Sequence, residues 1–136
     1  MGSYADDALF MSRNNIEYVE LISDDGKSKV MVIPAWQGRV MTTSAAGDEG
    51  DSYGWINYSF IKKRQIDLQF NPVGGEERFW LGPEGGVFSL YFRQGEKQIY
   101  KNWKVPPVLD IEAFKIQSQS KNCCLLYTSP SPRDRG

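Results

Sequence analysis

The chain has 136 residues, of which 40% are hydrophobic and 13% aromatic, and this content suits one globular domain with a buried core. Its formal net charge is −1 and its charges are scattered, so neither a basic stripe for nucleic acid nor a cationic membrane patch is expected. The sequence contains no histidine, which excludes histidine triads, histidine zinc sites and histidine acid–base pairs built from this chain alone.

A short helix and one strand are expected at the start of the chain. Residues 5–15 (ADDALFMSRNN) suit one or two helical turns, with Leu9 and Phe10 as apolar anchors. Residues 16–22 (IEYVELI) alternate apolar and charged side chains and are rich in β-formers, which predicts a half-buried strand.

Two further strands follow and complete an antiparallel unit. Residues 28–33 (SKVMVI) predict the return strand, and the Asp25-Gly26 pair before them favours a tight hairpin turn. Pro34 ends the pairing because it has no N–H to donate. Residues 39–44 (RVMTTS) also alternate and predict a third strand.

The middle of the chain combines an acidic loop with aromatic and apolar segments. Residues 45–52 (AAGDEGDS) hold acids between glycines, but their spacing differs from the EF-hand pattern, so a solvated loop is expected and no metal site. Residues 53–61 (YGWINYSFI) are dense in aromatics and predict a buried strand or an aromatic-lined turn. Residues 66–70 (IDLQF) alternate again and predict a strand.

The stretch around which the chain is organised is residues 74–86 (GGEERFWLGPEGG). Its two Gly-Gly pairs allow positive φ angles or a close approach to a ligand. Between them, the carboxylates of Glu76 and Glu84 and the guanidinium of Arg78 can hydrogen-bond sugar hydroxyls. Trp80 can stack on the apolar face of a sugar ring. The alternative is structural: Trp80 belongs to the core, and Arg78 forms a salt bridge with Glu84.

The remaining segments are interpreted as strands joined by turns. Residues 87–92 (VFSLYF) are the most hydrophobic β-run and predict a central strand. Residues 100–105 are amphipathic, Pro106-Pro107 stiffens an exposed link, and residues 114–120 (FKIQSQS) predict one more strand. Because no long 3.6-residue period follows the first fifteen residues, the chain is interpreted as all-β, an antiparallel β-sandwich of about seven or eight strands.

The C-terminal segment is interpreted as foreign to the natural protein. Residues 124–136 begin with CLLYTSPSPRD, which looks like the in-frame translation of a sequencing adapter, and Cys123 at the junction is suspect too. A genuine Ser/Pro-rich disordered tail is the alternative. The adapter interpretation leaves the Cys123-Cys124 pair without information on disulfides or metals, and it implies that the gene continues beyond this point.

Three stretches together resemble an uncharacterised bacterial family that is common in environmental genomes: PAWQGRVMTTSAAGD (34–48), GWINY (54–58) and the Gly-rich stretch at 74–86. More distantly, they resemble the galactose mutarotase and aldose epimerase superfamily, in which comparable strands and a Gly-Gly loop lie at the mouth of a sugar cleft. The matching positions here are Pro34, Gly38, Arg39, Gly74, Gly75, Arg78, Trp80 and Pro83. The resemblance implies a galactose mutarotase-like supersandwich, of which this chain would be the N-terminal half.

The resemblance also implies a carbohydrate or sugar-like small molecule as the partner. The substrate-binding residues would be Arg39, Glu76, Arg78, Trp80 and Glu84. Mutarotases use histidines as acids and a glutamate from the C-terminal half as the base. This chain has no histidine, and any such glutamate lies beyond its end, so the catalytic residues are unknown. Epimerase activity is an expectation for the full-length protein only, and neither a cofactor nor a metal is expected.

Two alternatives remain open at this point. In a polysaccharide-degrading accessory, a hydrolase or a lyase, Glu76 and Glu84 would face one another as paired carboxylates across the loop. In a structural or interaction domain, the aromatic side chains of residues 53–61 would only pack. A broad glycan-binding panel distinguishes the second alternative from a sugar-binding role.

The expected organisation is an N-terminal arm at 1–15, a partial β-sandwich at 16–122 and the adapter-derived tail at 123–136. Half a sandwich leaves strand edges and an apolar face uncovered, so the fragment is expected to self-associate. No apolar run is long enough to span a membrane, and residues 1–10 lack the features of a signal peptide. The compartment is unknown: cytoplasmic, or periplasmic if the natural N-terminus lies further upstream.

Overall fold

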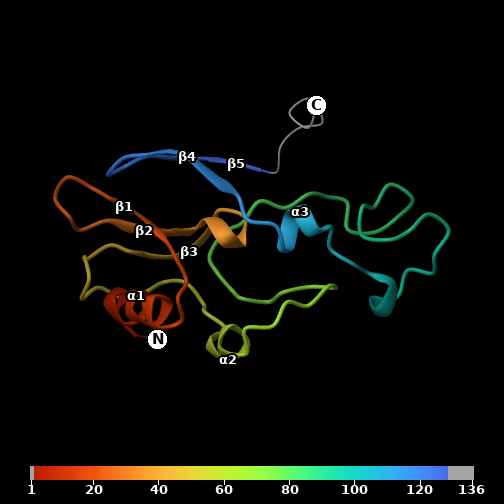
Figure 1. Ribbon diagram of the computed structural model, residues 1–136, viewed down its shortest axis with the longest axis horizontal. Helices are drawn as coiled ribbons and strands as arrows, with labels where there is room; N and C mark the ends of the chain where they lie inside the picture. The colour runs from red at the N-terminus through yellow and green to blue at the C-terminus, as the bar shows by residue number, and fades with distance from the viewer. Residues whose placement is uncertain (1, 129–136) are drawn as a thin grey trace.

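The computed structural model describes residues 2–128, and its regular structure consists of two antiparallel sheets with a few short helices (Figure 1). The elements in chain order are α1 (Tyr4–Arg13), β1 (Val19–Ile22), β2 (Lys29–Ile33), the 3-10 turn η1 (Pro34–Trp36), β3 (Arg39–Ser44), α2 (Tyr58–Lys62), the 3-10 turn η2 (Tyr100–Asn102), α3 (Pro107–Asp110), β4 (Lys115–Gln119) and β5 (Cys124–Tyr127). None of the described helices is long and apolar enough to cross a membrane. The prediction that the chain is mainly antiparallel β structure is confirmed.

The larger sheet has the order β1-β2-β3, with both pairs antiparallel. These strands confirm the predictions at 16–22, 28–33 and 39–44, each with slightly narrower bounds. The predicted hairpin between β1 and β2 is also confirmed, because Gly26 takes a φ of 73° and the carboxylate of Asp25 accepts from the backbone N–H of Lys27 over 3.0 Å. The sheet is therefore formed by local connections that the sequence pattern encodes directly.

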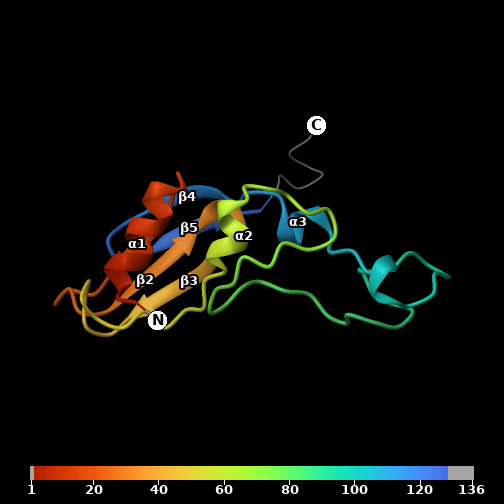
Figure 2. The same cartoon turned by 90° about the horizontal axis from the view of Figure 1, so that it is seen from below.

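Helix α1 packs along this sheet (Figure 2) and begins with a capping box at Ser3. The Ser3 side chain accepts from the Asp6 N–H over 3.2 Å, and the Asp6 carboxylate accepts from the Ser3 N–H over 3.1 Å. Tyr4 and Met11 are the apolar side chains that α1 buries in the core beside the sheet. The prediction that Leu9 anchors this helix is wrong. Its side chain is 48% exposed, because it lies on the face of the helix opposite Tyr4 and Met11.

The second sheet is the β4-β5 hairpin, which lies next to the larger sheet (Figure 1). A hydrogen bond links the two sheets: the Ile22 N–H of the edge strand β1 donates to the Lys121 carbonyl, in the turn between β4 and β5, over 2.8 Å. Leu126 packs so close to Gly38 that a Cβ atom there would lie 2.7 Å from Leu126 Cδ1. The strand predicted at 114–120 is thus confirmed. Of the adapter-like tail, residues 129–136 lie outside the described residues, and its foreign origin stays a prediction.

The strands predicted at 66–70 and 87–92 are wrong, and of the two alternatives for 53–61, a strand or an aromatic-lined turn, the strand is wrong. Residues 53–57 are irregular and lead into α2, and residues 66–70 and 87–92 form turns and bends with no partner strand among residues 2–128. Val87 and Phe88 are 87% and 84% exposed. The physical reason is that β-propensity measures packing against neighbouring strands. Here the backbone is not extended, because Gly86 has a φ of 91° and begins a turn. In this turn the Ser89 N–H donates to the Gly86 carbonyl.

A second apolar cluster holds the extended arm, which residues 66–106 form beyond the sheets except for the stretch at 74–77 that pairs beside β3 (Figure 1). Its buried members are Tyr91, Val105 and Leu109, and half-buried aromatic side chains pack around them: Phe70, Trp80, Phe92 and Trp103. The rings of Trp80 and Trp103 each stack on Tyr91, with centroids 5.2 and 5.6 Å apart. Aromatic stacking therefore organises this arm in place of strand pairing.

Candidate functional site

The first residues of the Gly-rich loop at 74–86 pair with the N-terminal end of β3. Gly74 adopts a φ of 96°, which favours glycine, and a Cβ atom on it would collide with the carbonyl oxygen of Trp55. The following residues run antiparallel to Val40, whose N–H donates to the Glu77 carbonyl over 2.9 Å. The positive φ angle predicted for the glycine pair is confirmed, and the close approach that it permits is to the chain's own backbone.

Two arginines from separate parts of the chain meet at the buried carboxylate of Asp110, the last residue of α3. Arg78, in the Gly-rich loop, donates from Nη1 to Oδ1 of Asp110 over 3.1 Å and from Nη2 to the Leu109 carbonyl. Arg39, the first residue of β3, places Nη2 3.8 Å from the same Oδ1. Its Nη1 donates to the Gly74 carbonyl over 2.9 Å. This cluster joins β3, the loop and α3.

Asn71 donates two hydrogen bonds to the second oxygen of the Asp110 carboxylate. Its backbone N–H and its side-chain Nδ2 donate to Oδ2 over 2.6 and 2.9 Å. The Asn71 side chain is itself fixed by the backbone of Asp67, because Oδ1 accepts from the Asp67 N–H and Nδ2 donates to the Asp67 carbonyl, each over 2.7 Å. Both oxygens of Asp110 therefore already accept hydrogen bonds from the chain.

The cluster carries more positive than negative charge, because two guanidinium groups share one carboxylate. Burial, together with the nearby charge of Arg78, lowers the pKa of Arg39 to about 10, while Asp110 acts in the opposite direction. Arg39 is only 3% exposed, and the Nε atoms of Arg39 and Arg78 are buried without a hydrogen-bond partner among residues 2–128. Buried N–H groups are normally paired, so both arginines retain unused hydrogen-bonding capacity, and of the two only Arg39 lines the pocket described next.

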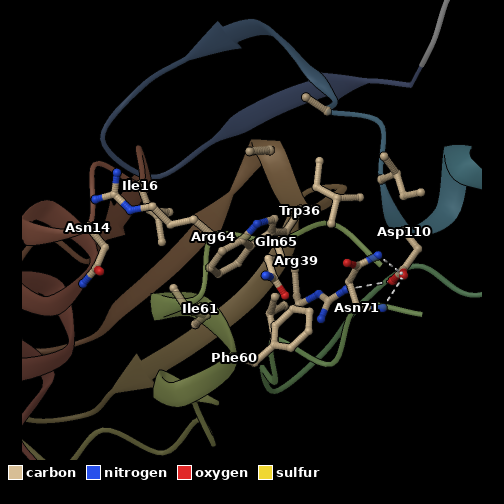
Figure 3. Close-up of a pocket in the computed structure, with 15 residues that line it drawn as sticks. Asn14, Ile16, Trp36, Arg39, Phe60, Ile61, Arg64, Gln65, Asn71 and Asp110 are labelled. Carbon is tan, nitrogen blue, oxygen red and sulfur yellow. Dashed lines mark hydrogen bonds and ion pairs between the residues drawn. The ribbon is translucent and has the colours of Figure 1, made fainter. Parts of the chain in front are cut away.

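A pocket of about 360 Å³ opens beside this cluster (Figure 3). Arg39, Asn71 and Asp110 form its polar wall, and Trp36 of η1 and Phe60 of α2 contribute aromatic rings. The remaining lining residues come from the connection between α1 and β1 and from segments next to η1, α2 and α3: Asn14, Ile16, Ala35, Ile61, Arg64, Gln65, Ile66, Val73, Ile111 and Ala113. The volume lies within the usual range for small-molecule sites.

Comparisons with known proteins identify a family. Residues 2–129 match a family of unknown function, DUF6786. The chain belongs to this family. A search of curated proteins and a search of solved structures each returned no match. The expected resemblance to a family of unknown function is thereby confirmed, while the DUF6786 description states neither a substrate nor an activity.

Two of the substrate-binding residues predicted for this DUF6786 chain, Arg39 and Arg78, come together at Asp110. Arg39 lines the pocket, whereas Arg78 reaches the same carboxylate without being part of the lining. The alternative salt bridge between Arg78 and Glu84 is wrong, because Asp110 takes the Arg78 guanidinium.

The other three predicted residues do not line the pocket. Glu76 accepts from the N–H and the Oγ1 of Thr43, over 2.6 and 2.9 Å. Trp80 donates from Nε1 to the Glu84 carboxylate over 2.7 Å, and its ring stacks on Tyr91. Glu76 and Glu84 are therefore bonded to different parts of the chain, and their role in substrate binding stays a prediction.

Sequence reasoning did not single out Trp36, Asn71 and Asp110. Trp36 lies within the motif PAWQG, so the motif itself was a usable signal. Asn71 directly follows a segment expected to be a strand, and Asp110 ends the sequence PVLD, for which no motif or strand was predicted. Neither spacing nor composition relates Asn71 to Asp110, because only the fold brings them together.

Proposed function

We propose that this DUF6786 chain is a carbohydrate-binding unit of the galactose mutarotase-like type, and that its sugar binds in the pocket beside Asp110. The observation that carries the proposal is a pocket in which Trp36 and Phe60 supply aromatic rings while Arg39 and Asn71 supply fixed polar groups. A sugar needs this combination, because its ring offers an apolar C–H face and a rim of hydroxyl groups. The motif resemblance to the mutarotase superfamily supports the same ligand class.

In this proposal the pocket supplies binding groups rather than an acid–base pair. Asp110 already accepts hydrogen bonds from Asn71 and Arg78, so its oxygens are poorly placed to take a proton from a sugar. Arg39, with a pKa of about 10, stays protonated at neutral pH. Opening a sugar ring needs an acid and a base on opposite sides of one C–O bond. Any epimerase chemistry of the full-length protein would draw its base from other residues.

The test is calorimetric titration of the chain with a panel of monosaccharides and short oligosaccharides. We expect measurable binding of at least one member, and an affinity loss of about 10-fold to 100-fold in Trp36→Ala because an aromatic stacking surface is removed. The matched control is Trp55→Ala, since Trp55 is 65% exposed and does not line the pocket. Absence of binding to the whole panel, or an equal loss in both variants, would refute the assignment.

A second candidate is an interaction domain that pairs with itself through the arm. The observation that favours it is a set of exposed apolar side chains on residues 66–100: Ile66, Leu68, Val87, Phe88, Leu90 and Tyr100. Sedimentation velocity over a range of concentrations tests this candidate. Self-association that Phe88→Ser weakens would support it, whereas a monomer at all concentrations would contradict it.

A further inference from the structure

The charges that line the pocket indicate which class of sugar suits it. Arg39 and Arg64 are the basic residues of the lining, and Asp110 is the acidic one. Asp110 also serves Arg78, which adds a further guanidinium to the cluster. Arginine side chains therefore outnumber carboxylates around the pocket, and buried positive charge without a counter-charge is unfavourable. An anionic ligand would remove this imbalance.

One edge of the buried Arg39 guanidinium has hydrogen-bonding capacity that an anion would satisfy. Nη1 donates to the Gly74 carbonyl over 2.9 Å, but Nε has no hydrogen-bond partner among residues 2–128, and Nη2 approaches Asp110 only to 3.8 Å. Nε and Nη2 lie on the same edge of the planar guanidinium. Their parallel N–H bonds match the two oxygens of a carboxylate, which is the usual bidentate geometry of arginine.

We propose that the ligand is an acidic sugar, a uronic acid, whose carboxylate pairs with the Nε–Nη2 edge of Arg39 while its ring lies against Trp36 and Phe60. This inference rests on the proposed carbohydrate-binding function and names the class of sugar. Arg64 is exposed just beyond α2, where its charge attracts an anion toward the pocket. Neutral sugars fit the aromatic wall equally well but leave the Arg39 edge without a charged partner.

The experiment compares uronates with the neutral sugars that differ only at the carboxylate. The full chain is titrated with D-glucuronate against D-glucose and with D-galacturonate against D-galactose, and acetate and sulfate test for a plain anion site. We expect each uronate to bind at least about 10-fold more tightly than its neutral counterpart, because the paired carboxylate adds a charge-assisted bidentate contact. Acetate and sulfate, which have no ring to stack, should bind at least about 10-fold more weakly than the uronates.

Variants locate the preference at the pocket. Arg39→Gln should lower the uronate affinity about 100-fold and the neutral-sugar affinity less than about 3-fold, since only the ionic contact is lost. If this buried substitution prevents folding, Arg64→Gln is used, and it should lower uronate affinity about 3-fold at low salt but not at about 1 M salt. The control Arg93→Gln removes an exposed arginine that does not line the pocket and should change neither affinity.

The outcomes separate this inference from the proposed function on which it rests. Equal affinity for neutral and acidic sugars would overturn the uronate inference and leave the carbohydrate-binding function standing. Binding of acetate or sulfate as tight as that of the uronates would overturn it in favour of a simple anion site. Failure of all sugars to bind would overturn both. A uronate preference that is undiminished in Arg39→Gln, or undiminished at low salt in Arg64→Gln, would also overturn it, because the carboxylate would then be recognised elsewhere.

Discussion

The carboxylate of Asp110 lies 3.1 Å from Nη1 of Arg78 and so joins α3 to the Gly-rich loop across 32 residues of sequence. The side chain of this aspartate is only 1% exposed, which makes the contact a buried ion pair. Burying charges is unfavourable unless they are paired, so the cluster depends on all its members. Its stability and the shape of the pocket are therefore linked.

We predict that Asp110→Asn strongly destabilises the protein. The variant keeps the side-chain shape but leaves two arginine side chains in the interior without a counter-charge, which costs about 3 to 5 kcal/mol when one partner of a buried pair is removed. Urea denaturation measures the loss. The control is Asp24→Asn, whose side chain is 100% exposed and should change stability by less than about 0.5 kcal/mol. Equal effects of the two substitutions would contradict the buried ion pair.

A second prediction concerns the two glycines at opposite ends of the loop. Gly74 and Gly86 have similar φ angles of 96° and 91°, but only Gly74 lacks room for a Cβ atom, because the Trp55 carbonyl lies against it. Gly86→Ala should lower the free energy of unfolding by about 1 kcal/mol, because alanine is strained at this φ angle. Gly74→Ala should cost about 3 kcal/mol, since overpacking is added. Thermal or urea unfolding compares the variants, and an equal loss in both would show that the close contact is absent.

A third prediction separates packing from binding at Trp80. Its ring is stacked on Tyr91 and lies under the Arg78 guanidinium, 4.5 Å from the ring centroid. Trp80→Ala should therefore destabilise the chain by about 2 kcal/mol, less than the cost for a fully buried tryptophan because Trp80 is half-buried. Near-ultraviolet circular dichroism should lose the signal of the stacked rings. If Trp80 were instead a sugar platform, the variant would keep its stability and lose sugar affinity.

A fourth prediction concerns alkaline pH. The Tyr58 hydroxyl donates to Asp7, and burial first, then this bond, raise the pKa of Tyr58 from 10.0 to about 12. A raised folded-state pKa contributes stability that is fully present below pH 10 and is lost as the pH rises through about 12.

Comparison with Tyr58→Phe isolates this contribution. The free energy of unfolding of the parent should fall more steeply between about pH 10 and pH 12 than that of the variant, as measured by urea denaturation at each pH. Other groups that titrate in this range, including Arg39, are common to both proteins and cancel in the difference. Parallel pH profiles would contradict the predicted role of the Tyr58 hydroxyl.

The parts of the fold that could be predicted are those whose signals are local. Strands β1, β2 and β3 follow from alternation and from the Asp25-Gly26 turn, because each strand pairs with its neighbour in sequence. Residues 87–92 have an equally strong β pattern but no partner strand in the part of the chain that the structure describes, and Val87 and Phe88 remain exposed. Composition indicates what a segment prefers, whereas pairing depends on what lies beside it.

The candidate site was predictable only where a motif contained it. Arg39 and Arg78 stand in recognisable stretches, and they meet in the structure. Asp110, which brings them together, stands in a segment without a motif and reaches Asn71 across 39 residues. Long-range partners of this kind are selected by the packing of α3, which no local pattern of the sequence records.

The N-terminal helix α1 forms hydrogen bonds with residues that are translated much later. Asp7 accepts hydrogen bonds from Ser52 and Tyr58, which follow it by 45 and 51 residues. During synthesis, α1 emerges from the ribosome before these partners have been added to the chain. An isolated helix of ten residues is marginal in water, so α1 depends on packing against residues that follow it in the chain. The native contacts of α1 are thus completed by residues that are translated well after it.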